Sequence, residues 1–221
     1  CCYWLRTSRH SYSRYYLEIL MNQHEGSARP ANRPQRGTRI TRTLDLANPR
    51  LIGVWKWNFG EVSRRLYAIC VFAPTVLREA YPLEELQHLK AYIEQQALKV
   101  ENMIDWTRSQ FDATGLQEGE PGWMEALSAD IRTPLAGAYA DLFVRADLAI
   151  RLLDALWVQQ ALTDAGHEER TTAMRRAPLK ILGETRKAHA RCQNSIQALY
   201  RQRESSDLLC PLGSQAHPDW N

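Results

Sequence analysis

The nine residues Thr38 to Leu46, TRITRTLDL, decide the fold, because no other stretch of the sequence looks like a β-strand. Apolar and polar side chains alternate along them with the period of two that is typical of a half-buried strand. The apolar side consists of Ile40, Leu44 and Leu46, and the polar side consists of Arg39, Thr41, Thr43 and Asp45. A lone strand is unstable in water, so we expect it to pair with the same strand from a second copy of the chain.

This pairing predicts a homodimer or a higher oligomer. Antiparallel pairing places Arg39, Thr41 and Thr43 of both copies on one exposed surface. The resulting two-stranded basic ribbon is narrow enough to enter the major groove of double-stranded DNA. An ordinary edge strand or an extended arm is the alternative interpretation of the same stretch.

Several other residues are candidates for contacts with DNA. The lead-in before the strand, the strand itself and the helices after it supply Arg36, Arg42, Asn48, Arg64 and Arg65. Arg42 falls on the nominally apolar side of the strand, and two explanations stay open. Its side chain extends past the ribbon edge to a phosphate, or the register differs by one residue and Thr38, Ile40 and Arg42 face the groove.

The residues after the strand predict two helices. Asn48 and Pro49 are suited to begin a helix, Gly60 to end it, and an amphipathic pattern continues from Glu61 to about Phe72. Residues 38–73 therefore have the element order of a ribbon-helix-helix unit, although many proteins contain that order.

A mainly α-helical extension is expected over residues 82–203. Its expected segments are a long helix at 82–111 with an apolar seam that needs a partner helix, a short helical piece at 123–129, a central core helix from about 135 to 163, and a helix at 168–203 bent or divided near Pro178. Residues 1–37 are expected to be a disordered basic lead-in, and residues 204–221 a flexible tail.

Charge is distributed unevenly along the chain. The formal net charge is +3, yet residues 1–50 hold nine arginines and three acids, whereas residues 81–130 hold ten acids and three bases. This asymmetry indicates a contact with a polyanion at the N-terminal end. The five cysteines form no metal-binding or disulfide pattern and no apolar run could span a bilayer, so we expect a soluble protein of the reducing cytoplasm with no membrane association. One hypothesis is that residues 1–20 lie upstream of a start at Met21.

No catalytic or cofactor motif was found. Nucleophile elbows, phosphate loops, dinucleotide fingerprints and paired metal ligands are all missing from the sequence, so we expect no enzyme activity, cofactor or metal. The aspartates at 141, 147 and 154 alternate with Arg145 and Arg151, which predicts a polar helix face with i,i+4 ion pairs. The six histidines are scattered, and the seven tryptophans are expected mostly in the core or at interfaces.

Residues 131–199 resemble the C-terminal part of the AcaB-like family of conjugative plasmids and integrating conjugative elements, especially in the stretch RTPLAGAYADLFVRADLAIRLLDALWVQQALTDAGHEERTTAMRRAPLKILGETRKAH. The shared pattern is an aromatic residue near a proline, a long leucine-rich helix with regularly placed aspartates, a break and an arginine-rich helix. TRITRTLDLANPR is similar to that family's alternating Thr/Arg strand. The resemblance covers about residues 38–200. It implies a dimeric ribbon-helix-helix regulator that acts on promoter DNA and reads bases with Arg39, Thr41 and Thr43.

The sequence thus predicts a sequence-specific DNA-binding transcriptional regulator of the transfer genes of a mobile element, in the bacterial cytoplasm and at the nucleoid. Two rival functions stay open. One is a helical scaffold of the conjugation or excision machinery that binds only protein, and the other is an RNA-binding protein that uses the basic arm. The ribbon distinguishes the first rival, because DNA binding requires its polar face to be exposed and a scaffold would bury it.

Overall fold

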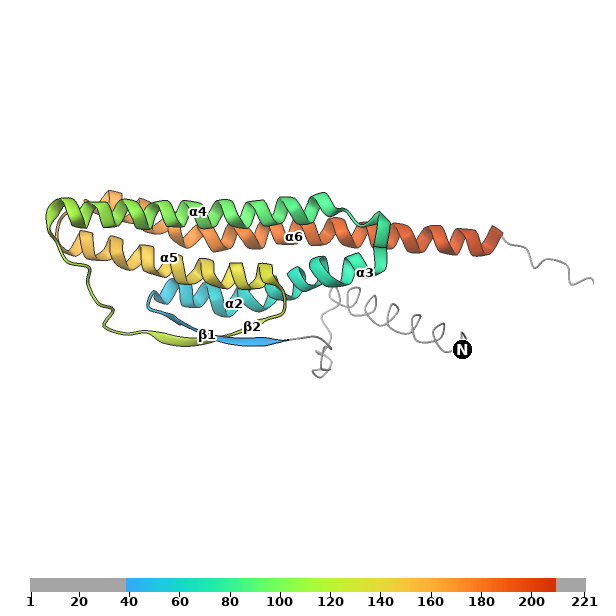
Figure 1. Cartoon of the computed structure of the whole chain (residues 1–221), viewed down its shortest axis with the longest axis horizontal. Coiled ribbons are helices and arrows are strands. Elements are labelled where there is room, and N and C mark those ends of the chain that lie inside the picture. Colours follow the sequence, from blue (N-terminus) through green and yellow to red (C-terminus); the bar gives the residue numbers. More distant parts are fainter. Residues whose placement is uncertain (1–38, 210–221) are drawn as a thin grey trace, which may run out of the picture. The chain divides into compact units, whose positions relative to one another are not determined.

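The computed structural model describes the backbone of residues 39–209, which belong to a compact unit distinct from residues 1–37 (Figure 1). The predicted lead-in, with Arg36, therefore lies outside the described residues, as do residues 210–221 of the predicted tail. The elements are β1 (Ile40–Leu46), α2 (Pro49–Tyr67), a π-helical turn (Ala68–Phe72), α3 (Ala73–Leu77), a 3-10 turn (Arg78–Ala80), α4 (Leu83–Thr114), β2 (Glu125–Ile131), α5 (Pro134–Val158) and α6 (Asp164–Leu209).

The predicted strand is present, but its partner belongs to the same chain. β1 pairs antiparallel with β2 over the whole length of both strands, from Ile40 opposite Ile131 to Leu46 opposite Glu125. The expectation that β1 pairs with a second copy in place of a strand of its own chain is therefore wrong, and so is the short helix predicted at residues 123–129. The described part of the chain is mainly helical with one two-stranded sheet.

The sequence of β2, EALSADI, does not by itself predict a strand. Leu127 and Ala129 are buried, whereas Ala126 and Ser128 are exposed, so the strand does alternate. Alanine, leucine and glutamate are good helix formers. Because small side chains occur on both faces of the strand, the two faces differ little in hydrophobicity. Pairing with β1 and burial of Leu127 override this local preference, as tertiary context often does for strands.

The inner face of the sheet covers α2 and α5. Leu44 and Leu46 of β1 and Leu127 of β2 join the same hydrophobic core as the helices. On the other side of α2 and α5 lie α4 and α6, which complete the bundle (Figure 1). The sheet is therefore an outer layer on the helical bundle, with its second face directed away from the core.

Helix α2 does not break at Gly60. It starts as predicted, with Asn48 as its N-cap and Pro49 in its first turn, but it continues as one helix to Tyr67. The predicted turn between two helices is therefore wrong, and the order strand, helix, turn, helix does not form as expected. A glycine on an exposed helix face is tolerated, because it weakens the helix by only about 1 kcal/mol relative to alanine.

The predicted seam of the long helix is correct, but its partners lie within the chain. Ile93, Val100, Ile104 and Phe111 are buried, and α4 packs against α5 and α6. Neither the seam nor β1 therefore requires a second copy of the chain. The homodimer stays a prediction, although the strand and the apolar seam from which it was inferred both find partners within the chain. Light scattering at micromolar concentration tests it.

The two remaining helices are largely as expected. Helix α5 is rich in buried apolar residues, and Thr133 caps it by accepting a hydrogen bond from the Ala136 N–H. Helix α6 runs undivided through Pro178 to Leu209, so of the two predicted alternatives, a bend or a division, the division is wrong, and the helix ends six residues later than expected. None of the helices within residues 39–209 is long and apolar enough to cross a membrane.

The pairing of β2 can be tested with two neighbouring substitutions. Leu127→Ala removes a buried side chain and should lower the free energy of unfolding by about 2–3 kcal/mol. Ser128→Ala changes the exposed side of the same strand and should alter that free energy by about 0.5 kcal/mol or less. Chemical denaturation of the two variants measures both values. Equal losses would contradict the orientation of β2.

Candidate nucleic-acid interface

The outer face of the β1–β2 sheet brings together the three residues predicted to read bases. Leu44 and Leu46 are buried, so the alternating residues of β1 point outward: Thr41, Thr43 and Asp45. Arg39, which immediately precedes β1, contacts Asp130 on the same face. In the register of the sheet, Thr41 lies opposite Asp130, Thr43 opposite Ser128 and Asp45 opposite Ala126. Thr41, Thr43 and Ser128 are all exposed. Sequence reasoning missed the contribution of β2 to this surface because it missed the strand.

Arg39 forms an ion pair with Asp130 across the ribbon. Its guanidinium lies 2.7 Å from the carboxylate, and 56% and 41% of the two side chains are exposed. An ion pair as exposed as this one contributes at most about 1 kcal/mol, so it can open readily for another partner. The outer face carries one arginine and two aspartates, Asp45 and Asp130, and is therefore not basic. Its recognition groups are hydroxyls and one guanidinium.

The position of Arg42 settles the question of register. Arg42 shares the side of β1 with the buried leucines, but it lies near the free end of the strand and is exposed. Its guanidinium donates a hydrogen bond to Asp141 of α5. The side chain thus extends past the sheet, as in the first explanation, but it reaches a carboxylate of the same chain. Arg39, Thr41 and Thr43 are the outward set.

Asn48 anchors the turn between β1 and α2. Its side-chain oxygen accepts hydrogen bonds from the N–H groups of Arg50 and Leu51, which satisfies the first turn of the helix. The N–H groups of Ala47 and Asn48 donate to Asp147 of α5, at 3.0 and 2.7 Å. The side chain of Asn48 is therefore occupied as a helix cap, and its predicted DNA contact has no structural support.

Asp147 is the buried member of the predicted polar face of α5. It is 1% exposed and also accepts a hydrogen bond from Arg151, which confirms one i,i+4 ion pair. The second predicted pair is wrong, because Arg145 binds Glu101 and Asp141 binds Arg42. Asp154 binds His167. The three aspartates therefore fix α5 to β1, α2 and α6 and form no carboxylate cluster.

Arg64 and Arg65 have different environments although they are adjacent. Arg65 is half-buried, forms an ion pair with Glu61 and contacts the ring of His189 at 3.2 Å. Glu61 also binds Arg186 of α6, and this hydrogen bond is the main cause of its lowered pKa. Arg65 is thus part of the α2–α6 interface, which disfavours the predicted phosphate contact. Arg64 is exposed and remains a candidate.

His189 makes stability depend on pH. Burial, followed by the charges of Arg65 and Arg64, lowers its pKa to about 4. Between pH 6.5 and 4 the unfolded chain binds a proton that the folded chain does not, so the free energy of unfolding should fall as pH falls through this window. The slope should be at most about 1.4 kcal/mol per pH unit. Urea denaturation at several pH values should show a flatter dependence for His189→Gln than for the wild type.

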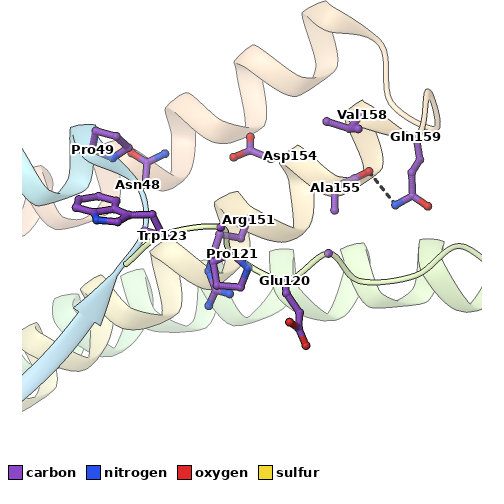
Figure 2. Close-up of a pocket in the computed structure, with 13 residues that line it drawn as sticks. Asn48, Pro49, Glu120, Pro121, Trp123, Arg151, Asp154, Ala155, Val158 and Gln159 are labelled. Carbon is purple, nitrogen blue, oxygen red and sulfur yellow. Dashed lines mark hydrogen bonds between the residues drawn. The ribbon is translucent and has the colours of Figure 1, made fainter. Parts of the chain in front are cut away.

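One cleft lies at the end of the ribbon where β1 turns into α2. It has a volume of about 480 Å³, and Figure 2 shows Trp123 near Asn48 and Pro49, with Arg151, Asp154 and Gln159 contributed by α5 and the residues that follow it. Two of the charged side chains there already have partners within the chain, because Arg151 binds Asp147 and Asp154 binds His167. Within residues 39–209, no cluster of His, Cys, Asp or Glu side chains is placed to hold a metal ion.

Comparison with known proteins identifies the fold. No family model matches the chain, and no curated protein sequence matches it. Among solved structures, the chain is similar to AcaB from uropathogenic E. coli, with a TM-score of 0.62 and 19% sequence identity. The similarity covers 76% of this chain and 88% of the AcaB chain. The chain therefore has an AcaB-like fold, in agreement with the expectation from its sequence.

Proposed function

We propose that the protein binds double-stranded DNA with the outer face of the β1–β2 ribbon and thereby regulates transcription of the transfer genes of a mobile element. The observation that carries this proposal is the exposure of Arg39, Thr41, Thr43 and Ser128 on one side of a two-stranded antiparallel ribbon. Two paired strands are narrow enough to lie in the major groove, about 12 Å wide, where each base pair presents a distinct pattern.

The chemistry of the outer face suits base edges better than phosphates. Arginine can donate two hydrogen bonds to guanine, threonine and serine can contact several bases, and the aspartates can accept from the amino group of cytosine. Because the face is not basic, attraction to phosphates has to come from cations outside it. Arg64, exposed on α2, is one candidate, and the sequence of the N-terminal segment contains further arginines.

The exposure of Thr41 and Thr43 in the single chain meets the requirement for DNA binding through the ribbon. The rival scaffold would bury both residues against its protein partner, so the structure of an assembly distinguishes the two hypotheses. The reading surface is complete in one chain, since β2 supplies its second strand. The proposal retains the homodimer, in which two ribbons related by two-fold symmetry would contact the two halves of a palindromic site.

The direct test is selection of bound duplexes from a random DNA library by the full-length protein at physiological salt. A DNA-reading ribbon should enrich one short sequence, and affinity for that sequence should exceed affinity for random duplex by about a thousandfold. Random duplex and single-stranded RNA are the comparisons. Binding without sequence enrichment, or tighter binding to the RNA, would contradict the proposal.

A further inference from the structure

The side of α2 that faces solvent carries an unusual stripe of residues. Arg50, Gly53, Trp57, Gly60 and Arg64 follow one another at intervals of three and four, so they lie along one face of the helix. The buried residues of α2 lie on the other side. Trp57 is 85% exposed, more than any other large hydrophobic side chain in the described part of the chain. We call these five residues the α2 stripe.

The two glycines of the α2 stripe have no packing role within the chain. A Cβ atom added at Gly53 or Gly60 would meet no atom within 4 Å. Glycine inside a helix is less stable than alanine, and alanine would fit at both positions. The glycines do, however, leave the helix surface bare on both sides of Trp57. A flat ligand could therefore approach the indole and the backbone beside it.

The charges at the two ends of the α2 stripe are positive. Arg50 and Arg64 are both exposed, and each lies seven residues from Trp57, which corresponds to about 10.5 Å along the helix axis. Neither arginine forms an ion pair with another residue of the described range, 39–209. Glu61, three residues before Arg64, already binds Arg65 and Arg186. Glu168, which lies within the electrostatic influence of Arg50, binds Thr172 and Arg175.

We propose that the α2 stripe binds a single strand of nucleic acid, with a base stacked on Trp57 and phosphates bound by Arg50 and Arg64. An exposed aromatic ring between cations is the arrangement that single-strand-binding surfaces use without sequence preference. A second copy of the chain fits poorly, because parallel or antiparallel pairing of two α2 stripes places arginine against arginine. An acidic protein would satisfy the arginines but would not need bare helix on both sides of the ring.

Apart from Arg64, which is also a candidate for a duplex phosphate contact, this surface shares no residue with the proposed duplex-binding site. Trp57 and the arginines lie on α2, whereas the proposed duplex-reading residues lie on β1 and β2. The inference therefore goes beyond the proposed function and can hold or fail without it. Its consequence is a protein that can bind an unpaired strand on α2 and a duplex on the ribbon.

The test is fluorescence anisotropy of a labelled twelve-residue oligothymidine with the full-length protein. Trp57→Ala should weaken binding about tenfold or more, without a change in salt dependence, because stacking is lost and no charge is removed. Trp57→Phe should recover part of the affinity. Arg50→Gln with Arg64→Gln should reduce the slope of log affinity against log salt by about 1.4, as expected for two lost single-strand phosphate contacts.

Two kinds of variant provide controls. Leu98→Ala and Lys99→Gln change an exposed apolar and an exposed charged residue on α4 and should leave oligothymidine binding unchanged. Gly53→Gln with Gly60→Gln should weaken binding but leave the thermal transition at least as high as in the wild type, because both sites have room and glutamine favours helix. Wild-type affinity in Trp57→Ala would overturn the proposal. Equally effective competition by polyglutamate would also overturn it and indicate an acidic protein partner.

Discussion

Replacement of Asp147 by alanine is expected to lower the free energy of unfolding by about 3–4 kcal/mol. Asp147 is almost fully buried and accepts three hydrogen bonds, from the N–H groups of Ala47 and Asn48 and from Arg151. The substitution leaves two backbone donors and a partly buried guanidinium without their partner, and loss of one member of a buried pair is strongly destabilising. Chemical denaturation at neutral pH measures the loss.

Two variants on the same helix make this prediction specific. Asp141→Ala removes an aspartate that also binds an arginine of β1, but both side chains are nearly half exposed. It should therefore reduce stability by about 1 kcal/mol or less. Asp147→Asn keeps one oxygen as an acceptor for the two N–H groups and should lie between the two alanine variants. Equal and small effects of the two alanine substitutions would show that the turn after β1 does not depend on Asp147.

Much of the bundle could be predicted from periodicity alone. Apolar residues at intervals of three and four gave α4 and α5, and the helical pattern after residue 168 gave most of α6. The alternation of polar and apolar residues predicted which side chains of β1 face outward. The strand β2 could not be predicted in this way, because its alternation consists of alanine and serine beside only one buried leucine. Its presence depends on pairing with residues about 85 positions earlier, which no local pattern records.

The proposed functional surfaces were also predicted only in part. Arg39, Thr41 and Thr43 were found because alternation identifies which side of a strand is exposed. Trp57 was missed as an exposed residue, although its position relative to the apolar residues of α2 carries that signal. Trp55 shares the helix side of Phe59 and Val62, while Trp57 lies two residues further around the helix. Of the five tryptophans in the described chain, Trp55 is buried in the core and Trp106 packs against it, whereas Trp57, Trp123 and Trp157 are exposed.

The largest functional effect should come from replacing Arg39, Thr41 and Thr43 together by alanine. If the ribbon lies in the major groove, each good base contact contributes about 1–3 kcal/mol of discrimination, so affinity for the selected duplex should fall at least about a hundredfold. Binding to random duplex should change less, because phosphate contacts elsewhere persist. Stability should change little, since the three side chains are exposed. Gel-shift titrations of the two duplexes and a thermal melt measure these quantities.

A matched triple on α4 controls for the loss of exposed polar groups. Arg108, Ser109 and Thr114 are also exposed, and Arg108 forms an exposed ion pair with Glu118, as Arg39 does with Asp130. Their joint replacement by alanine should leave both duplex affinities unchanged. Asp130→Asn should raise affinity for the selected duplex, because it releases Arg39 and removes a negative charge from the face presented to DNA. Since this substitution and the ribbon triple act in opposite directions, a general loss of fold cannot produce both results. If the ribbon triple selects the same duplex with wild-type affinity, the ribbon does not read DNA.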